Sequence, residues 1–274
     1  MRLTRNKSDK IHTEDRPKLL KTIIRAPFSG RHRNRLAFFT VPYELIPVVR
    51  LSLLSSDGRY MYIRNSKAAC SAVTQTIHHW ETGEFSAKNV HIQPVLRQGN
   101  EHLHSLAKAL TDPNVYRFSF VRDPLARALS GFSNFFLDNR NKQRKHHIEP
   151  MTRMGFSPDK ATERNFDVFL DYVERCIEEE PIFMDAHFRP QFYNLRPDLV
   201  KYDRIGKVHN LSGELRDLAE VLGLPEPAGI DKPQFNVSMK RYEATPEQVQ
   251  RVRRIYAKDY AEFQFETPAS GGAR

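Results

Sequence analysis

Two short segments of the chain carry residue types that proteins use to hold phosphate or sulfate groups. The first, residues 63–72, contains Lys67 and Ser71 among small side chains. Small side chains let backbone N–H groups approach an anion, and the N-terminus of a following helix adds a partial positive charge. We therefore predict an anion cradle here. The alternative is an ordinary tight turn with an exposed lysine.

The second segment, residues 118–132, places Arg122 directly after an apolar run. Ser130 follows Asp123 by about two helical turns, so the two side chains can share one face of a helix. A guanidinium fork and a hydroxyl together suit a phosphate monoester. The alternative is that Arg122 and Arg127 pair with Asp123 in structural salt bridges.

Alternating strands and helices must position these two segments. We predict a hairpin at Ser56–Gly58, strands over 48–55, 59–63, 90–92, 116–121 and 203–208, and helices over 71–80, 124–137, 166–177, 212–222 and 245–263. This alternation predicts an α/β fold, a three-layer α/β/α arrangement with a central, mainly parallel sheet. Ligands of such sheets bind beyond the carboxyl ends of the strands, where both segments begin.

Several predicted helices carry their own boundary signals. Pro124 suits a first helical turn, where its missing N–H costs nothing. Asn165 can cap the helix that follows it, and Gly223 can end another. Thr245–Gln248 has the pattern of a capping box. Residues 139–147 are polar and basic, and we predict a loop there.

Charge is concentrated at one end of the 274-residue chain. The formal net charge is +10, and residues 1–35 carry +8 of it. We expect a flexible basic arm over 1–35, a single folded domain over 36–267 and a disordered tail over 268–274. Eighteen Phe and ten Tyr exclude wholesale disorder, and two Cys exclude a dense disulfide framework or a cysteine zinc cluster.

Five segments together resemble one enzyme family. Residues 122–132 read R-D-P-x-x-R-x-x-S-x-F, similar to the 3′-phosphate-binding motif of sulfotransferases that use PAPS (3′-phosphoadenosine 5′-phosphosulfate). The turn at Lys67 resembles the 5′-phosphosulfate loop of the carbohydrate sulfotransferases, sulfotransferase family 2, which includes the chondroitin enzymes. Three further segments resemble motifs of that branch: His187–Gln191, Tyr202–Lys207 and Ile255–Phe263.

The resemblance implies a P-loop-NTPase-like sulfotransferase fold, although the chain has no Walker A sequence. The sequence differs from the family pattern at a few positions. Ser66 stands in place of the Pro before Lys67, and Phe188 in place of a Trp. Ala72 and Val73 replace an Asn-Trp pair. None of these changes removes a charge or hydroxyl that the reaction needs.

The resemblance also implies roles for individual residues toward PAPS. Lys67 meets the charge that grows on the bridging oxygen, and Arg122 and Ser130 hold the 3′-phosphate. Lys240 and Arg241 close over the nucleotide. The 5′-phosphate is held by the backbone N–H groups and hydroxyl of Ala68, Ala69, Cys70, Ser71 and Ala72.

A general base must take the proton of the acceptor hydroxyl, and histidine suits this role near neutral pH. His187 leads because it lies in a family-like segment, although it could instead only order its loop. His91 is the second candidate. The pairs His78/His79 and His102/His104 more often decorate a helix face than bind metal, so we expect no metal.

The resemblance implies transfer of a sulfuryl group from PAPS to a hydroxyl on a carbohydrate or glycolipid, giving PAP and a sulfate ester. A phenol or small alcohol stays open as acceptor. Two alternatives are another nucleotide-dependent phosphate-transfer enzyme and a basic nucleic-acid-binding module. The first lacks Walker and kinase motifs, and the second leaves Arg122 and Ser130 unexplained, so we expect no nucleic-acid partner.

The sequence also suggests a location. It begins without the apolar core of a signal peptide, and we see no membrane anchor of the kind that Golgi members of the family carry. We therefore expect a bacterial cytoplasmic enzyme or a shortened form of a longer protein. The basic arm could still bring it to the periphery of an anionic membrane or to an anionic polymer.

Overall fold

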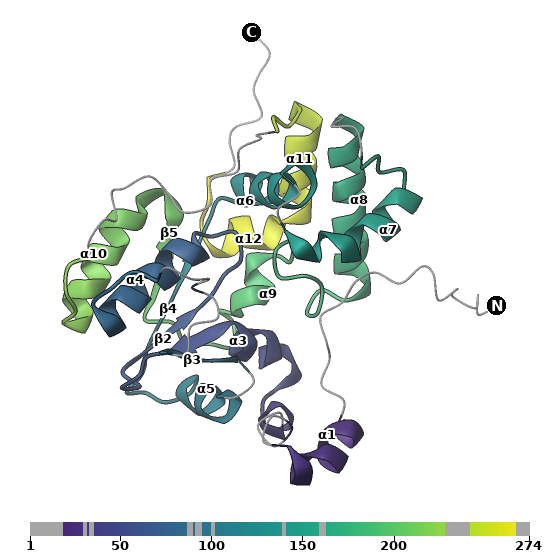
Figure 1. Cartoon of the computed structure of the whole chain (residues 1–274). Coiled ribbons are helices and arrows are strands. Elements are labelled where there is room, and N and C mark those ends of the chain that lie inside the picture. The colour runs from purple at the N-terminus through teal and green to yellow at the C-terminus, as the bar shows by residue number, and fades with distance from the viewer. Residues whose placement is uncertain are drawn as a thin grey trace. The chain divides into compact units, whose positions relative to one another are not determined.

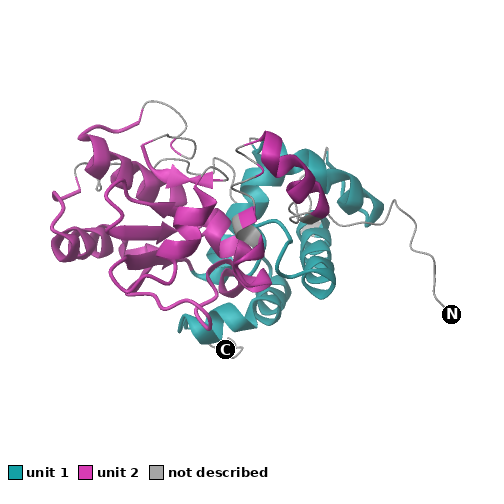
Figure 2. Ribbon diagram, turned by 90° about the horizontal axis from the view of Figure 1, so that it is seen from below, with its two compact units in different colours: residues 1–15, 123–190, 238–274 teal, residues 16–122, 191–237 magenta. Residues whose placement is uncertain are grey.

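The computed structural model describes residues 19–29, 32, 36–86, 90, 95–99, 102–138, 141–158, 163–227 and 242–266. The chain forms two compact units from interleaved segments (Figure 2). Unit 1 consists of residues 1–15, 123–190 and 238–274, and unit 2 of residues 16–122 and 191–237. The predicted limits of the arm and the tail, at 35/36 and 267/268, remain predictions.

Unit 2 contains the sheet and the helices that cover it (Figure 1). Its elements in chain order are α1 (Leu19–Arg25), η2 (Ala26–Phe28), η3 (Leu36–Phe39), η4 (Tyr43–Leu45), α3 (Ile46–Leu51), β1 (Ser52–Leu54), β2 (Tyr60–Ile63), α4 (Cys70–Thr82), β3 (Arg97–Gln98), α5 (Leu103–Ala109), β4 (Tyr116–Val121), α9 (Gln191–Leu195), β5 (Arg204–Lys207), η9 (Val208–Asn210) and α10 (Leu211–Leu222).

The five strands lie in the order β3-β1-β2-β4-β5. β2, β4 and β5 are parallel neighbours, whereas β1 runs antiparallel to both β2 and β3. Four strands therefore run in the same direction, which confirms the prediction of a mainly parallel sheet. Val121 pairs with Lys207, so β4 and β5 end together at one edge of the sheet.

Helices cover both faces of this sheet. Aromatic side chains at alternate positions of β2 and β4 pack against α4 and α10 in one apolar cluster, whose buried members are Leu53, Tyr60, Tyr62, Val73, Ile77, Leu96, Phe118, Phe120, Leu215 and Leu218. Arg117 points to the other face, where its guanidinium donates to the carbonyls of Ala109 in α5 and Asp112 just beyond it. The three-layer arrangement is thus confirmed.

Several predicted elements of unit 2 are confirmed. β4 has the predicted bounds, and the β1–β2 hairpin turns through Gly58 at φ +81°. The helix over 212–222 ends as predicted at Gly223, which adopts φ +62°.

One predicted strand of unit 2 is wrong. Residues 46–51 form helix α3, and only Ser52–Leu54 form a strand. Pro47 lies in the first turn of α3, and the helix is buried over 46–49. A short apolar run gives the same pattern in a buried helix and a buried strand, so periodicity could not separate them. Most of the predicted strand over 90–92 lies outside the described residues.

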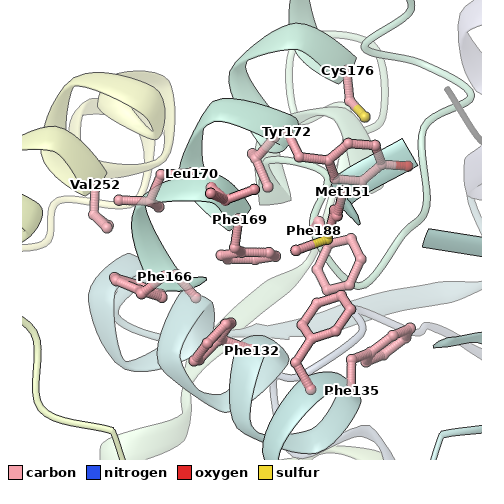
Figure 3. Close-up of a cluster of buried hydrophobic side chains, with 14 of the residues drawn as sticks. Phe132, Phe135, Met151, Phe166, Phe169, Leu170, Tyr172, Cys176, Phe188 and Val252 are labelled. Atoms are coloured by element: carbon pink, nitrogen blue, oxygen red, sulfur yellow. The ribbon is translucent and has the colours of Figure 1, made fainter. Parts of the chain in front are cut away.

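Unit 1 is helical. It contains α6 (Pro124–Phe132), a π-helical turn η7 (Ser133–Leu137), η8 (Lys142–Arg144), α7 (Lys145–Arg153), α8 (Glu163–Glu179), α11 (Pro246–Ile255) and α12 (Ala257–Glu262). Its core is rich in aromatic side chains, among them Phe132, Phe135, Phe166, Phe169 and Phe188 (Figure 3). Phe166, Phe169, Leu170 and Val173 line one side of α8, as their spacing predicts.

Unit 1 corrects four predictions. The helix over 124–137 changes to π geometry at Ser133, and the helix over 245–263 breaks at Tyr256. Residues 145–153, predicted partly as loop, form α7. Asn165 lies inside α8 rather than at its cap, and its amide exchanges two hydrogen bonds with the backbone of Ser157.

Two helices of unit 1 begin with a side-chain cap, of which the one at Thr245 was predicted and the one at Asp123 was not. Asp123 accepts a hydrogen bond from the backbone N–H of Ala126 over 2.8 Å, with Pro124 in the first turn of α6. Thr245 and Gln248 form the predicted capping box of α11. Within the described segments, every helix is too short or too polar to span a bilayer.

Candidate active site

The turn between β2 and α4 carries the first predicted anion site. Residues 66–69 form the turn, in which Lys67 adopts φ +67° and Ala69 adopts φ +56°. Positive φ is unfavourable for side chains with a Cβ, by about 1–2 kcal/mol per residue. Backbone that alternates between the two helical hands turns successive N–H groups into one concavity, which suits an anion. The local conformation therefore supports a functional turn over an ordinary one.

Helix α4 begins directly after this turn. Ala69 occupies its N-cap and makes no side-chain capping bond, and the first intrahelical bond runs from Val73 N–H to Ala69 O. The N–H groups of residues 70–72 therefore precede the helical hydrogen-bond ladder. Of the predicted cradle, Cys70, Ser71 and Ala72 lie at the positive end of the 13-residue helix and Ala69 is its N-cap. The N–H of Ala68 instead donates to the carbonyl of Asn65 over 3.1 Å.

Arg122 lies one residue beyond the carboxyl end of β4. It is half-buried, and its Nη1 lies 3.5 Å from the backbone oxygen of Lys67. Its own backbone is held by the side-chain amide of Gln191, which accepts from the Arg122 N–H over 2.9 Å and donates to the Arg122 oxygen over 2.8 Å. Unit 2 therefore brings the guanidinium of Arg122 to the backbone of the Lys67 turn.

Ser130 and Arg127 lie on α6, in unit 1. Arg127 is buried, and its Nη2 donates to the carbonyl of Ala186 over 2.9 Å. The carboxylate of Asp123 accepts the capping bond from Ala126, so it serves the start of α6. Arg127 thus ties α6 to the segment that carries His187. Ser130 is half-buried two turns into the helix.

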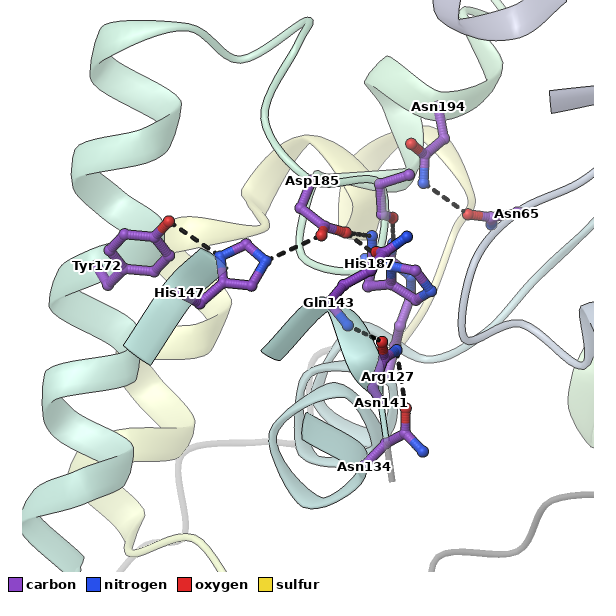
Figure 4. A network of polar contacts seen from close by, with 11 residues as sticks. Asn65, Arg127, Asn134, Asn141, Gln143, His147, Tyr172, Asp185, His187 and Asn194 are labelled. Atoms are coloured by element: carbon purple, nitrogen blue, oxygen red, sulfur yellow. Dashed lines mark hydrogen bonds and ion pairs between the residues drawn. The ribbon is translucent and has the colours of Figure 1, made fainter. Parts of the chain in front are cut away.

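His187 forms a close pair with Asp185 in unit 1 (Figure 4). Its Nδ1 lies 2.7 Å from Oδ1 of Asp185, which also accepts the His187 backbone N–H over 2.8 Å. The ring of Phe135, from the π-helical turn, lies 5.1 Å from the imidazole. A carboxylate can only accept, so in neutral His187 it holds the proton on Nδ1 and leaves Nε2 as the basic nitrogen.

A second histidine binds the same carboxylate. His147 Nε2 lies 3.0 Å from Oδ2 of Asp185, and His147 Nδ1 lies 3.0 Å from the hydroxyl of Tyr172. Burial alone would raise the pKa of Asp185, but the charge of His187 and the hydrogen bonds from both imidazoles lower it well below the ordinary carboxyl value. Asp185 therefore stays ionised beside His187.

Asp185 and His147 are not among the residues predicted from the sequence. For Asp185, the one local signal was the spacing Asp-x-His at 185–187, because a carboxylate two residues away can reach an imidazole. His147 lies 38 residues from its partner, and only the fold brings the two together.

Three predicted site residues, His91, Lys240 and Arg241, lie outside the described residues, so their roles remain predictions. His78 contacts the Glu84 carbonyl and His79 stacks on Phe85, as residues on a helix face do. Among the described residues, no group of three or more His, Cys, Asp or Glu side chains could hold a metal ion.

Comparison with known proteins agrees with this geometry. A family model described as "Sulfotransferase family" matches residues 48–266. Carbohydrate sulfotransferase 14 of Danio rerio is 24% identical over 208 residues, which cover 74% of this chain and 56% of that protein. The human protein of the same name is 31% identical over 184 residues, covering 65% of this chain and 48% of the relative.

Carbohydrate sulfotransferase 12 of Xenopus laevis is 25% identical over 214 residues, covering 66% of this chain and 51% of that protein. The chain thus spans about half the length of these relatives. No solved structure gives a significant match.

Proposed function

The chain belongs to the sulfotransferase family, whose model spans residues 48–266, and from this premise we propose that it transfers a sulfuryl group from PAPS to an acceptor hydroxyl. The observation that carries the proposal is the turn at Lys67, where a cation and the N-terminus of α4 meet the strand end that carries Arg122. Kinase and nucleic-acid-binding functions receive no support from the family match.

Donor binding falls to three groups in this proposal. The N–H groups at the start of α4, with the hydroxyl of Ser71, hold the 5′-phosphate of PAPS. Arg122 and Ser130 hold the 3′-phosphate, which ATP lacks. Lys67 faces the oxygen that bridges phosphorus and sulfur, where negative charge grows as the bond to sulfur breaks.

Proton removal falls to His187. The acceptor oxygen attacks sulfur while the bond from sulfur to the bridging oxygen breaks, and PAP leaves with that electron pair. The acceptor proton passes to Nε2 of His187, and Asp185 stabilises the resulting imidazolium. The hydrogen bond from Nδ1 to Asp185 favours this role over one of only ordering the loop. His91 remains the second candidate.

The acceptor that we propose is a hydroxyl of a carbohydrate, either free or on a glycolipid. The support comes from the relatives, which are named carbohydrate sulfotransferases. We further propose that the reaction needs no metal, because Lys67 and Arg122 supply the cations that phosphate and sulfate require.

The N-terminal region offers a way to reach a membrane-borne acceptor. The net charge of +8 over residues 1–35 would attract an anionic surface. On α1 and η2, large apolar side chains lie exposed beside Lys21 and Arg25; they are Leu20, Ile23, Ile24 and Phe28. Exposed apolar side chains next to basic ones favour binding to a bilayer interface over binding to a soluble polymer.

This attachment is tested by sedimentation with vesicles of phosphatidylcholine, with and without phosphatidylserine. We expect binding to the anionic vesicles alone, and its loss when residues 1–35 are deleted. A cytoplasmic location remains a prediction, which fractionation of producing cells tests.

A thermal-shift experiment tests the donor assignment without an acceptor. PAP should raise the melting temperature of the protein more than ADP does at equal concentration, because a ligand stabilises the folded state according to its affinity. The difference should disappear in Arg122→Ala. Equal shifts with PAP and ADP in the wild-type protein would instead indicate a general nucleotide site.

A further inference from the structure

The side-chain amide of Gln191 makes the two hydrogen bonds to the Arg122 backbone that a neighbouring strand would otherwise make. Gln191 is fully buried, and it bonds both the N–H and the C=O of Arg122, at 2.9 and 2.8 Å. Two bonds to one residue fix the direction of its backbone, as strand pairing does. Gln191 therefore fixes the backbone position from which the Arg122 side chain extends.

The same amide is tied to the turn that carries Lys67. Asn65, two residues before Lys67, donates from Nδ2 to Oε1 of Gln191 over 2.8 Å and to the carbonyl of Phe120 over 3.0 Å. Asn194 in turn donates to Oδ1 of Asn65 over 3.0 Å (Figure 4). All three amides, Asn65, Gln191 and Asn194, are fully buried.

These amides lie where backbone pairing between β2 and β4 stops. The last paired residues are Tyr62 and Phe118. Beyond them, side chains make the connections, from the hydroxyl of Ser119 to the Ile63 carbonyl at 2.7 Å and from Asn65 to Phe120. In such sheets ligands bind beyond the carboxyl ends of the strands, which is where these amides lie.

We propose that Gln191, which accepts a hydrogen bond from Asn65, is a positioning residue that sets the spacing between the Lys67 turn and Arg122, and so the affinity for the nucleotide. Asn194 supports it indirectly, through its bond to Asn65. This inference rests on the proposed function, since it assumes that both cations hold one nucleotide. Gln191 acts through Arg122. Replacing Gln191 would remove the amide partner of the Arg122 N–H and C=O. The backbone of Arg122 could then shift, and the position of the guanidinium would no longer be fixed.

The chain offers a matched control in Gln75 of α4. Its Nε2 donates to the Ser86 carbonyl over 3.0 Å, and its Oε1 accepts the Ser86 N–H over 2.9 Å. Gln75 is also buried and lies in unit 2. Gln75→Leu therefore removes the same pair of side-chain-to-backbone bonds without touching Arg122 or the Lys67 turn.

The test is a double-mutant cycle on PAP affinity, measured by calorimetry. The variants are Gln191→Leu, Arg122→Ala, the double variant and Gln75→Leu. We expect Gln191→Leu to weaken PAP binding at least about tenfold, as expected when a buried hydrogen-bond pair is lost. In the Arg122→Ala background the same change should have little further effect, since the two residues act as one unit. Gln75→Leu should bind PAP within about twofold of wild type.

The outcomes separate the two claims. If Arg122→Ala weakens binding but Gln191→Leu binds normally, or if the two losses simply add, the positioning role of Gln191 is wrong and the proposed function stands. If the wild-type protein binds no PAP, or Arg122→Ala binds it normally, the proposed function fails and the role of Gln191 with it.

A second variant covers the case in which Gln191→Leu does not fold. Gln191→Glu keeps the shape and an oxygen that accepts from Arg122 N–H, but its carboxylate cannot donate to the Arg122 carbonyl. It should weaken PAP binding relative to the wild-type protein, because a carboxylate oxygen would face the Arg122 carbonyl in place of a donor. Unchanged affinity in this variant would overturn the role of the donated bond.

Discussion

Asp185 Oδ1 accepts two hydrogen bonds from His187, one from the ring Nδ1 over 2.7 Å and one from the backbone N–H over 2.8 Å. Through this double contact, the carboxylate fixes both the position of the residue and the nitrogen that carries its proton. The imidazole keeps partial access to solvent, with 27% of its side chain exposed, whereas Asp185 is buried. A histidine held in this way can present Nε2 to a substrate hydroxyl.

We expect His187→Ala to lower kcat by about 10²–10⁴-fold, the usual contribution of a general base. Added imidazole should restore part of the lost rate, because it can occupy the vacated space and accept the proton. His104→Ala, which removes an exposed histidine from α5, should keep full activity. Loss of activity without any rescue by imidazole would favour a purely structural role for His187.

Asp185 also makes stability depend on pH. Its folded-state pKa lies well below the ordinary carboxyl value of about 3.9, so its contribution is fully present above that value and is lost as the pH falls toward the folded pKa. Asp185→Asn should therefore cost about 2 kcal/mol in the free energy of unfolding at pH 7, the value of charge-assisted hydrogen bonds.

Denaturant titrations from pH 7 down to pH 3 check this prediction. The difference between wild type and Asp185→Asn should shrink below about pH 4. Asp217→Asn provides the control, since Asp217 is largely exposed in its pair with Arg204, and it should change stability little at any pH. A difference for Asp185→Asn that stays constant over the whole range would contradict the assigned ionisation.

Glycine substitutions in the Lys67 turn should affect stability and transfer activity differently. Lys67 and Ala69 both adopt positive φ, which glycine tolerates without steric cost. Lys67→Gly and Ala69→Gly should each leave stability unchanged or raise it by up to about 1 kcal/mol, after the entropy that glycine loses on folding. Only Lys67→Gly should abolish transfer.

This pair of variants separates the backbone of the turn from its charge. Melting curves and initial rates of transfer measure the two effects side by side. If Lys67→Gly keeps its activity, the cation is not needed for the reaction. If Ala69→Gly also loses activity, the conformation of the turn matters more than the lysine.

Gly206 of β5 packs against Phe120 of β4, the strand that precedes Arg122. A Cβ at this position would lie 2.7 Å from the ring of Phe120 in β4, too close for either residue to remain in place. Gly206→Ala should therefore destabilise the protein by about 1–3 kcal/mol, as overpacking of a core does, and weaken PAP binding because β4 carries Arg122 at its end. Calorimetry with PAP, beside a denaturant titration, measures both, and unchanged PAP affinity would show that Arg122 tolerates a shift of β4.

The sequence indicated the strand–turn–helix units of the site because their signals are local. β4, the start of α6 at Pro124 and the positive end of α4 follow from runs of neighbouring residues. The amide network of Gln191 and the link from Asp185 to His147 join residues 38 to 129 positions apart, so no local pattern could reveal them. The mistaken strand at 48–51 has the opposite cause, since a short buried apolar run fits both helix and strand.

The most direct test of the central claim is transfer of labelled sulfate from PAPS by the purified protein. The assay offers oligosaccharides, glycolipids, phenols and small alcohols as acceptors, and compares the wild-type protein with Lys67→Ala and Arg122→Ala, each verified as folded. We predict labelled sulfate ester on a carbohydrate acceptor, stoichiometric PAP, and loss of both products in the two variants. Full turnover by both variants, or no labelled product from any acceptor with the wild-type protein, would contradict the proposed function.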